Sequence, residues 1–286
     1  MTADGSPASD HLLQQATAWW STSIIDIHPG EIVVRGYPIQ ELIGELSFPQ
    51  MVWLMLRGEV PSREQAKLLE AALVAAVDHG PQAPSIAISR MAVTCGLPIN
   101  GAMASAINAL DDIHGGAGQQ CMELYQSIAQ RADAGDSEKD AVEPELDRFI
   151  AERGKIVPGF GHRFHGIDPR AVKLLDLVRR AQASEVVSGH FARIGTLIEQ
   201  SLKRRKGRGI PMNIDGATAV IYSELGFAAP LGRGLFVLSR SVGILAHAWE
   251  QTQQGGRIKG PMPPKIPFQY TGPPVRRFEP KQTETS

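Results

Sequence analysis

Apolar residues recur at helical intervals along most of this chain, with Pro or Ser before many runs and Gly after them to mark helix starts and ends. The run over 62–80, SREQAKLLEAALVAAVDHG, stops at a Gly-Pro pair and predicts a helix with Asp78 and His79 at its C-terminal end. Over 21–37, two β-branched runs flank a His-Pro-Gly-Glu turn, which predicts a small hairpin. The sequence therefore predicts an all-α fold with a small N-terminal β-hairpin.

Changes in composition suggest how these helices are divided. The small polar residues at 1–10 predict a disordered tail. The charged, turn-prone stretch at 133–144, DAGDSEKDAVEP, predicts a solvated connection into a smaller domain. We therefore expect a large helical domain over 11–135 and 210–286, and a small domain over 136–209.

The overall charge and the cysteines exclude several classes of protein. The 29 basic and 30 acidic side chains leave a formal charge of −1, so no global field attracts nucleic acid. Cys95 and Cys121 lack the spacing of a disulfide framework or a structural zinc site. The N-terminus lacks the basic start and apolar core of a signal peptide, and no apolar run is long enough to cross a bilayer. We expect a cytoplasmic protein with no nucleic-acid or membrane partner.

The stretch at 154–170, GKIVPGFGHRFHGIDPR, is the first candidate site. Gly159 and Gly161 allow the backbone to approach a ligand closely and to fix the aim of His162. The imidazole of His162 titrates near neutrality, and the guanidinium of Arg163 binds carboxylates or phosphates, which together indicate chemistry on an anionic substrate. A glycine-rich turn whose histidine satisfies local backbone groups explains the stretch equally well.

Two other segments carry candidate chemistry. His114 lies in a glycine-rich break at 111–118, in front of a helix. Asp215 stands just before an apolar helix, where an N-cap role is the simpler interpretation. The last strong helix is largely apolar around Arg240 and His247. A buried guanidinium needs a carboxylate, and a bound ligand is one way to supply it.

In this order, the motifs IHGGAGQ around His114, GFGHR around His162 and NIDG around Asp215 resemble the citrate synthase superfamily. The resemblance covers most of the chain, including LSRSVGILAHAWEQ and the terminal YTGP. The VDHGP and NIDGATAV segments look closer to citryl-CoA lyases, including the domain at the end of ATP-citrate lyase. That lyase domain lacks a histidine at the position matching His114, so IHGGAGQ looks like the synthase pattern.

The resemblance implies a fold, an assembly and a reaction. The fold would be that of citrate synthase, in a homodimer or higher oligomer whose active sites lie between the large and small domains. Asp215 would exchange the proton on the methyl carbon of acetyl-CoA, while His114 would hydrogen-bond the thioester oxygen. His162 would serve the carbonyl of oxaloacetate. In the cleavage direction, the same three residues would act on citryl-CoA in reverse order.

The resemblance also implies which residues bind the substrates. The carboxylates of citrate or oxaloacetate would be held by His79, Arg170 and Arg240. The coenzyme A thioester, as a substrate, would lie along Pro158, Gly159, Phe160, Gly161, Arg163 and Asn213. The chemistry uses protons and needs no metal. Lys265 stands near the terminal Tyr-x-Gly element, before which many synthases have an arginine that reaches the neighbouring subunit's ligand.

Other features have simpler interpretations. The basic patch at 203–208 predicts a solvated loop, with contact to coenzyme A phosphates as the functional alternative. The tail from Gly255, with seven prolines up to Pro280, predicts a segment that wraps over a surface and crosses to a partner subunit. His247 would shape the pocket or cap a buried hydrogen bond. The remaining histidines are expected at surface or packing positions: His11, His28, His165 and His190.

Three functions follow from these observations. The first is citryl-CoA lyase, giving acetyl-CoA and oxaloacetate. The second is a short citrate synthase, which would also hydrolyse the thioester. The third is a non-catalytic subunit that binds coenzyme A or citrate, against which the presence of both histidines and the aspartate argues.

Overall fold

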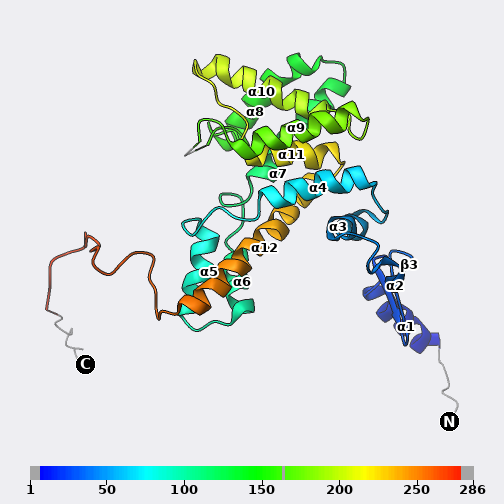
Figure 1. Cartoon of the computed structure of the whole chain (residues 1–286), viewed down its shortest axis with the longest axis horizontal. Coiled ribbons are helices and arrows are strands. Elements are labelled where there is room, and N and C mark those ends of the chain that lie inside the picture. Colours follow the sequence, from blue (N-terminus) through cyan, green and yellow to red (C-terminus); the bar gives the residue numbers. More distant parts are fainter. Residues whose placement is uncertain (1–6, 163–164, 278–286) are drawn as a thin grey trace, which may run out of the picture.

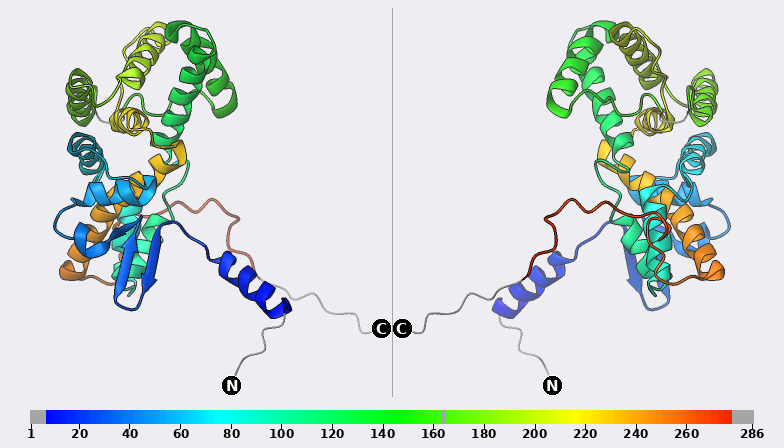
Figure 2. Two further views of the ribbon diagram at one scale, coloured as in Figure 1. Left: turned by 90° about the vertical axis from the view of Figure 1, so that its right-hand side faces the viewer. Right: turned by 90° about the vertical axis from the view of Figure 1, so that its left-hand side faces the viewer.

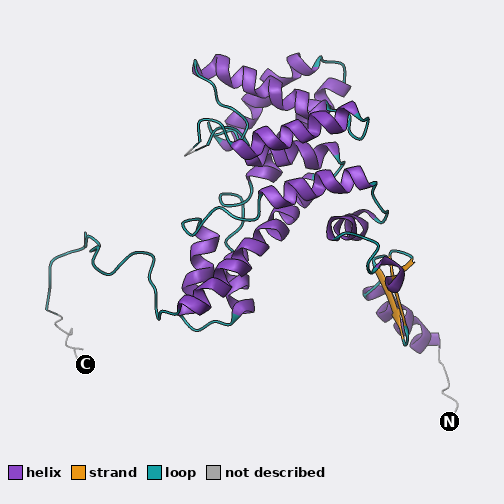
Figure 3. Ribbon diagram, viewed as in Figure 1, coloured by secondary structure: helices purple, strands orange, loops and turns teal. Residues whose placement is uncertain are grey.

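The computed structural model describes residues 7–162 and 165–277, which form a stack of α-helices beside one small sheet (Figures 1 and 3). The helices are α1 Pro7–Trp19, α2 Ile39–Leu42, α3 Phe48–Arg57, α4 Arg63–Ala75, α5 Pro84–Thr94, α6 Ile99–Ile107, α7 Ala117–Asp133, α8 Glu138–Arg153, α9 Pro169–Ala183, α10 His190–Lys206, α11 Ile214–Glu224 and α12 Ala229–Gln254. The predicted helical fold is confirmed.

The predicted hairpin is confirmed and gains a third strand. Strands β1 Ile25–His28 and β2 Glu31–Val34 pair antiparallel, and β3 Tyr37–Pro38 adds to the other edge of β2. The sheet lies against α3, where the guanidinium of Arg35 donates to the carbonyl of Met55 through Nε at 3.2 Å and Nη2 at 2.7 Å. This contact fixes the sheet to the helical body.

Helix α4 ends five residues earlier than the sequence predicts. It stops at Ala75, so Asp78 and His79 lie beyond the helix in a segment without regular secondary structure. The reason is the packing of α12: the Ser239 hydroxyl donates to Leu73 O, and Arg240 Nε donates to Ala76 O at 3.1 Å. Donors from α12 thus satisfy terminal carbonyls that a longer helix would have bonded itself.

The charged stretch at 133–144 is also more regular than predicted. Helix α8 begins inside it, at Glu138, with Ser137 as the N-cap and Pro144 within the helix. The basic patch is likewise not a loop, because 203–206 form the last turn of α10. There Arg204 pairs with Glu143 at 2.7 Å, which joins α10 to α8.

The main hydrophobic core lies among α3, α4 and α7–α12, with large buried side chains such as Trp53, Tyr125 and Tyr222. A smaller core joins α5, α6 and the C-terminal half of α12 around Ile244. Helix α12 therefore passes through both cores and runs along the lower part of the molecule (Figure 1). The division into large and small domains stays a prediction.

Both described ends of the chain extend away from the helical body (Figure 2). Helix α1 includes 7–10, which the sequence assigns to a disordered tail. At the other end, Thr94 accepts hydrogen bonds from the backbone of Ile258 and Lys259, at 2.9 and 3.0 Å, and the described tail after them is exposed. Within the described chain, no helix has both the length and the apolar character of a membrane span.

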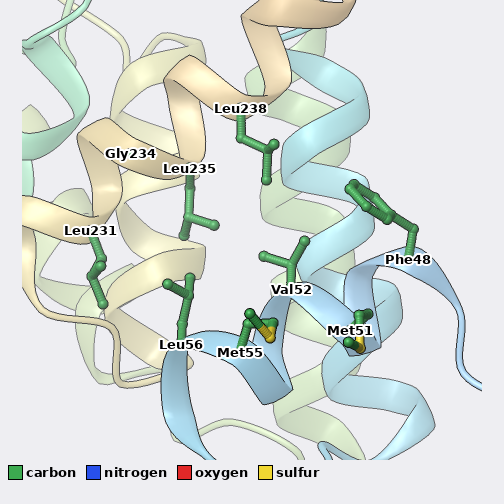
Figure 4. A pocket seen from close by; sticks show the side chains of 9 residues that line it. All are labelled: Phe48, Met51, Val52, Met55, Leu56, Leu231, Gly234, Leu235 and Leu238. Carbon is green, nitrogen blue, oxygen red and sulfur yellow. The ribbon is translucent and has the colours of Figure 1, made fainter. Parts of the chain in front are cut away.

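An apolar groove of about 390 Å³ lies between α3 and α12 (Figure 4). Met51, Val52 and Met55 line one side, and Leu235 and Leu238 line the other. Because none of its lining residues is titratable, the groove offers no acid or base for catalysis. A larger and more polar cavity lies elsewhere in the molecule.

Candidate active site

A cavity of about 830 Å³ opens where several segments distant in the sequence meet. Its walls come from the segment after α4, the loop before α7, the GFGHR loop, the start of α11 and the middle of α12. It is lined by six predicted residues, namely His79, His114, His162, Arg170, Asp215 and Arg240. All candidate catalytic and carboxylate-binding residues thus share one space.

His114 is held by the start of α5. The backbone N–H of Ser85 donates to His114 Nε2 at 3.1 Å, and the Ser85 hydroxyl oxygen lies 3.0 Å from the same nitrogen. Burial, with Arg240 and His79 nearby, lowers the pKa of His114. The neutral ring that accepts at Nε2 carries its proton on Nδ1. His114 can therefore offer a ligand a neutral N–H donor.

Asp215 lies in the first turn of α11, and the N-cap is Asn213 instead. The Asn213 side-chain oxygen accepts from the N–H groups of Asp215 at 2.9 Å and Gly216 at 3.3 Å. Burial raises the pKa of Asp215, although Arg170 and Arg240 act to lower it. The carboxyl group is thus tuned towards proton transfer nearer neutrality.

The GFGHR loop packs directly on this helix start. Asn213 N donates to Gly159 O at 2.9 Å, and Asn213 Nδ2 donates to Gly161 O at 2.6 Å. Gly159 has φ +83°, and a Cβ built there would lie 2.8 Å from the Cα of Gly216. Only glycine meets both requirements. The loop and Asp215 are consequently held in one fixed arrangement.

Three imidazoles gather at one side of the cavity. The rings of His79 and His162 meet edge to face with centroids 5.8 Å apart, and His165 stacks on His162 at 4.6 Å. The backbone N–H of His165 also donates to His162 Nδ1 at 3.1 Å, which favours the neutral tautomer protonated at Nε2. His165 is exposed, which agrees with its predicted surface position, and it also lines the cavity.

Arg170 is held by a carboxylate that the sequence did not single out. The fully buried side chain of Asp168 caps α9 and accepts from Arg170 Nε at 3.0 Å and Nη2 at 2.9 Å. The same carboxylate accepts from the N–H of Ile214, at the start of α11, at 3.1 Å. Burial acts to raise the pKa of Asp168, but the bonds from Arg170 outweigh it and the pKa is lowered. Asp168 thus orients both Arg170 and the Asp215 helix.

Arg240 is 5% exposed and its guanidinium carbon lies 4.9 Å from the ring centre of Phe236. Burial lowers the pKa of Arg240, while the charges of Asp78 and Asp215 act to raise it. Burial and the neighbouring cations Arg170 and Arg240 likewise lower the pKa of His79. Asp168 already pairs with Arg170, whereas no carboxylate of the described residues forms an ion pair with Arg240, so this buried cation favours a ligand that carries a carboxylate.

The residues expected to contact coenzyme A divide into two groups. Gly161 and Asn213 line the cavity. Pro158, Gly159 and Phe160 do not line it; Phe160 is buried and packs edge-on against Tyr125 with ring centroids 6.5 Å apart. Arg163 lies outside the described residues.

Sequence reasoning missed three supporting residues: Ser85, Asp168 and Asp78. For Asp168 the local signal was present, because Asp-Pro-Arg is a typical helix start in which the aspartate is the N-cap. Ser85 and Asp78 gave no local signal, because their partners lie on distant segments. Over the described ranges, no group of three or more His, Cys, Asp or Glu is arranged to hold a metal ion.

Comparison with known proteins gives consistent matches. The family model described as citrate synthase, C-terminal domain, matches residues 12–71 and 55–262. A citrate synthase from Acidithiobacillus ferridurans is 30% identical over 84% of this chain and 59% of its own length. The chain spans 52–59% of the length of the first curated relatives that it matches.

Solved structures share the fold. Citryl-CoA lyase from Hydrogenobacter thermophilus superposes with a TM-score of 0.79 at 31% identity, covering 91% of this chain and 97% of that one. A citrate synthase from Thermoplasma acidophilum, solved with carboxymethyl coenzyme A and oxaloacetate, gives a TM-score of 0.65 at 24% identity over 82% of this chain and 59% of that one. The second likeness concerns the fold alone.

Proposed function

Because this chain belongs to the citrate synthase family, we propose that it is an enzyme that breaks or forms the carbon–carbon bond between an acetyl-CoA unit and oxaloacetate. The specific activity that we propose is that of a citryl-CoA lyase. The observation that carries the proposal is the shared cavity of His114, His162 and Asp215 with the cations of Arg170 and Arg240. Such a cavity pairs a base and two imidazole donors with anchors for carboxylates.

In the cleavage direction, the proton of the tertiary hydroxyl of citryl-CoA passes to Nδ1 of His162 as the carbon–carbon bond breaks, because Nε2 already carries a proton. The hydrogen bond from the His165 N–H to Nδ1 must open for this transfer. The bonding electrons move into the thioester, and the resulting enolate oxygen accepts a hydrogen bond from His114 Nδ1. One fixed donor of this kind is typically worth about 3 kcal/mol. Asp215, in its acid form, then protonates the enol carbon to give acetyl-CoA, and oxaloacetate leaves.

The buried cation of Arg240 supports the choice of substrate. Arg240 and Arg170 bind carboxylates of the oxaloacetate half, with His79 as a further donor. The coenzyme A chain passes Gly161 and Asn213, whose backbone geometry is fixed by the loop-to-helix hydrogen bonds. Coenzyme A is a substrate here, and the proton chemistry of these residues requires no metal.

The lyase assignment is supported by structural likeness. The Hydrogenobacter citryl-CoA lyase superposes on this chain with a TM-score of 0.79 at 31% identity. Citrate synthase is the second candidate, favoured by the curated relatives of that name and by His114 in IHGGAGQ. A synthase would also hydrolyse the thioester of citryl-CoA.

The decisive experiment offers purified protein citryl-CoA and, separately, acetyl-CoA with oxaloacetate, while free thiol and oxaloacetate are followed. Oxaloacetate released from the first mixture, without thiol from the second, supports the lyase. Thiol from the second mixture supports the synthase. Failure of both mixtures would refute the reaction and leave a non-catalytic subunit that binds coenzyme A or citrate, which a binding assay with each ligand would then test.

We further propose a homodimer in which the cavity lies between the predicted large and small domains. The walls from 76–84 and 213–240 belong to the large domain, and those from 161–170 belong to the small one. The described tail beyond Lys259 extends from the body, which suits a segment that crosses to a second subunit (Figure 2). Light scattering of the full chain and of a chain ending at residue 259 would test this assembly.

A further inference from the structure

One face of α12 rests on the segment that carries His79 into the cavity. Arg240, Gly243 and His247 share this face, at positions i, i+3 and i+7. A Cβ at Gly243 would lie 2.2 Å from Val77 O and 3.2 Å from the Cβ of Asp78, so the helix and the segment are in backbone contact. Arg240 reaches the cavity from this face, whereas His247 reaches the segment from behind.

Behind the cavity, His247 meets the carboxylate of Asp78. Asp78 Oδ2 lies 3.4 Å from His247 Nε2 and accepts from the N–H of Gly80 at 3.1 Å. Burial acts to raise the pKa of Asp78, but the hydrogen bonds from Gly80 and His247 outweigh it and the pKa is lowered. The ionised carboxylate thus closes the turn that contains His79, and its charge also offsets that of Arg240.

A hydrogen bond from Arg90 of α5 fixes the tautomer of the His247 ring. Arg90 Nη1 lies 3.1 Å from His247 Nδ1, and a guanidinium can only donate. Nδ1 therefore accepts, and the Nε2–H of His247 donates to Asp78. Arg90 is itself fixed by Glu250 and Gln254 of α12, each at 2.5 Å.

We propose that His247, oriented by Arg90, is a positioning residue for the carboxylate substrate. It holds Asp78 in place, so that His79 and Arg240 keep the geometry and charge balance that binding of oxaloacetate or citryl-CoA requires. His247 does not line the cavity and touches no reacting atom. The inference rests on the proposed function, because it assigns a role in binding that function's substrate.

The test compares His247→Ala and His247→Gln with the wild-type enzyme. The assay uses either acetyl-CoA with oxaloacetate or citryl-CoA alone, whichever the wild-type enzyme turns over. The Ala variant should raise KM for the carboxylate substrate about tenfold, the effect of losing one hydrogen bond to a charged group. The kcat and the KM for acetyl-CoA should each change by less than roughly twofold. The Gln variant, whose amide nitrogen can replace Nε2, should recover most of the affinity.

Two further variants separate this role from general stability. Arg90→Gln frees the His247 tautomer and should give a smaller rise in the same KM. His28→Ala is the matched control, because His28 Nε2 lies 3.1 Å from Asp26 Oδ1 in an exposed pair on the hairpin. It should leave all constants unchanged.

An unchanged KM in His247→Ala, or parallel losses of kcat and affinity that the Gln variant does not restore, would overturn the positioning role while leaving the reaction intact. Wild-type protein that turns over neither mixture would instead refute the proposed function, and the inference would fall with it. Comparing the wild-type assay with the variant assay therefore tells the two failures apart.

Discussion

Replacing Gly159 with alanine tests whether the loop and the Asp215 helix act as one unit. A Cβ at this position would lie 2.6 Å from Cys121 Sγ and 2.8 Å from the Cα of Gly216, and φ is +83°. The positive φ costs an alanine about 1–2 kcal/mol. Overpacking adds about 1–3 kcal/mol, because the backbone of Gly216 cannot rotate away. The expected loss of stability is therefore about 2–5 kcal/mol.

Gly58→Ala is the matched control for this substitution. Gly58 has the same φ of +83° in the left-handed region but no atom within 4 Å of a built Cβ, so only the cost of the backbone conformation applies. Thermal unfolding should show a decrease in Tm of about 10 °C for Gly159→Ala and about 4 °C for Gly58→Ala. At a temperature where both variants are folded, only Gly159→Ala should lose about a hundredfold in kcat, since a shift of about 1 Å misplaces Asp215. Equal Tm losses with equal activity would refute the reasoning.

Three further predictions concern the cavity. Asp215→Asn should abolish exchange of the methyl protons of acetyl-CoA, followed by NMR in deuterated water, while coenzyme A binding by calorimetry stays nearly unchanged; retained exchange would remove Asp215 as the base. If Asp215 is the base, kcat/KM for acetyl-CoA falls as pH drops through its folded pKa, because only the carboxylate can accept a proton. Since burial raises that pKa, the acid limb of the pH profile should lie above the ordinary carboxyl value of about 3.9, and a limb at or below it would contradict the pKa shift. Arg240→Lys should raise KM for oxaloacetate or citryl-CoA by about tenfold or more, because an ammonium cannot form the bidentate fork, and an unchanged KM would exclude Arg240 as an anchor.

The helix starts could be predicted from the sequence because their signals are local. Ser47 and Ser62 each form a capping box with a glutamine three residues later, so four adjacent residues contain the whole interaction. The end of α4 depends instead on Ser239 and Arg240, which donate to carbonyls more than 160 residues away in the chain. A pattern read within one helix cannot include those donors.

The helical start of α8 was missed for a related reason. Its sequence is charged and contains Pro144, which alone favours a turn. In the structure, Glu143 on this helix pairs with Arg204 and Arg205 on α10. Burial acts to raise the pKa of Glu143, but a hydrogen bond from Ser201 and the bonds from the two arginines lower it to about 2. The ion pairs need both helices present. Neither charged run predicts its partner by itself.

For the candidate site, too, the sequence indicates the residue types but not the contacts that surround them. His114, His162 and Asp215 stood out because imidazoles and a carboxylate at loop-to-helix boundaries are unusual in an apolar helical chain. Their protonation could not be inferred, since it depends on Ser85 for one histidine and on the backbone of His165 for another. The sequence thus identified the chemical groups, and the fold assigned which nitrogen donates.

The two arginines of the cavity differ in what they can contribute to binding. Arg170 already donates one N–H from Nε and one from Nη2 to the buried carboxylate of Asp168, so three of its five N–H groups remain to meet a ligand. Within residues 7–162 and 165–277, no carboxylate forms an ion pair with Arg240, which bonds only the carbonyl of Ala76. A desolvated guanidinium gains most from the first carboxylate that reaches it. Affinity for a carboxylate substrate should therefore depend mainly on Arg240, whereas Arg170, fixed by its pair, sets where a second carboxylate must lie.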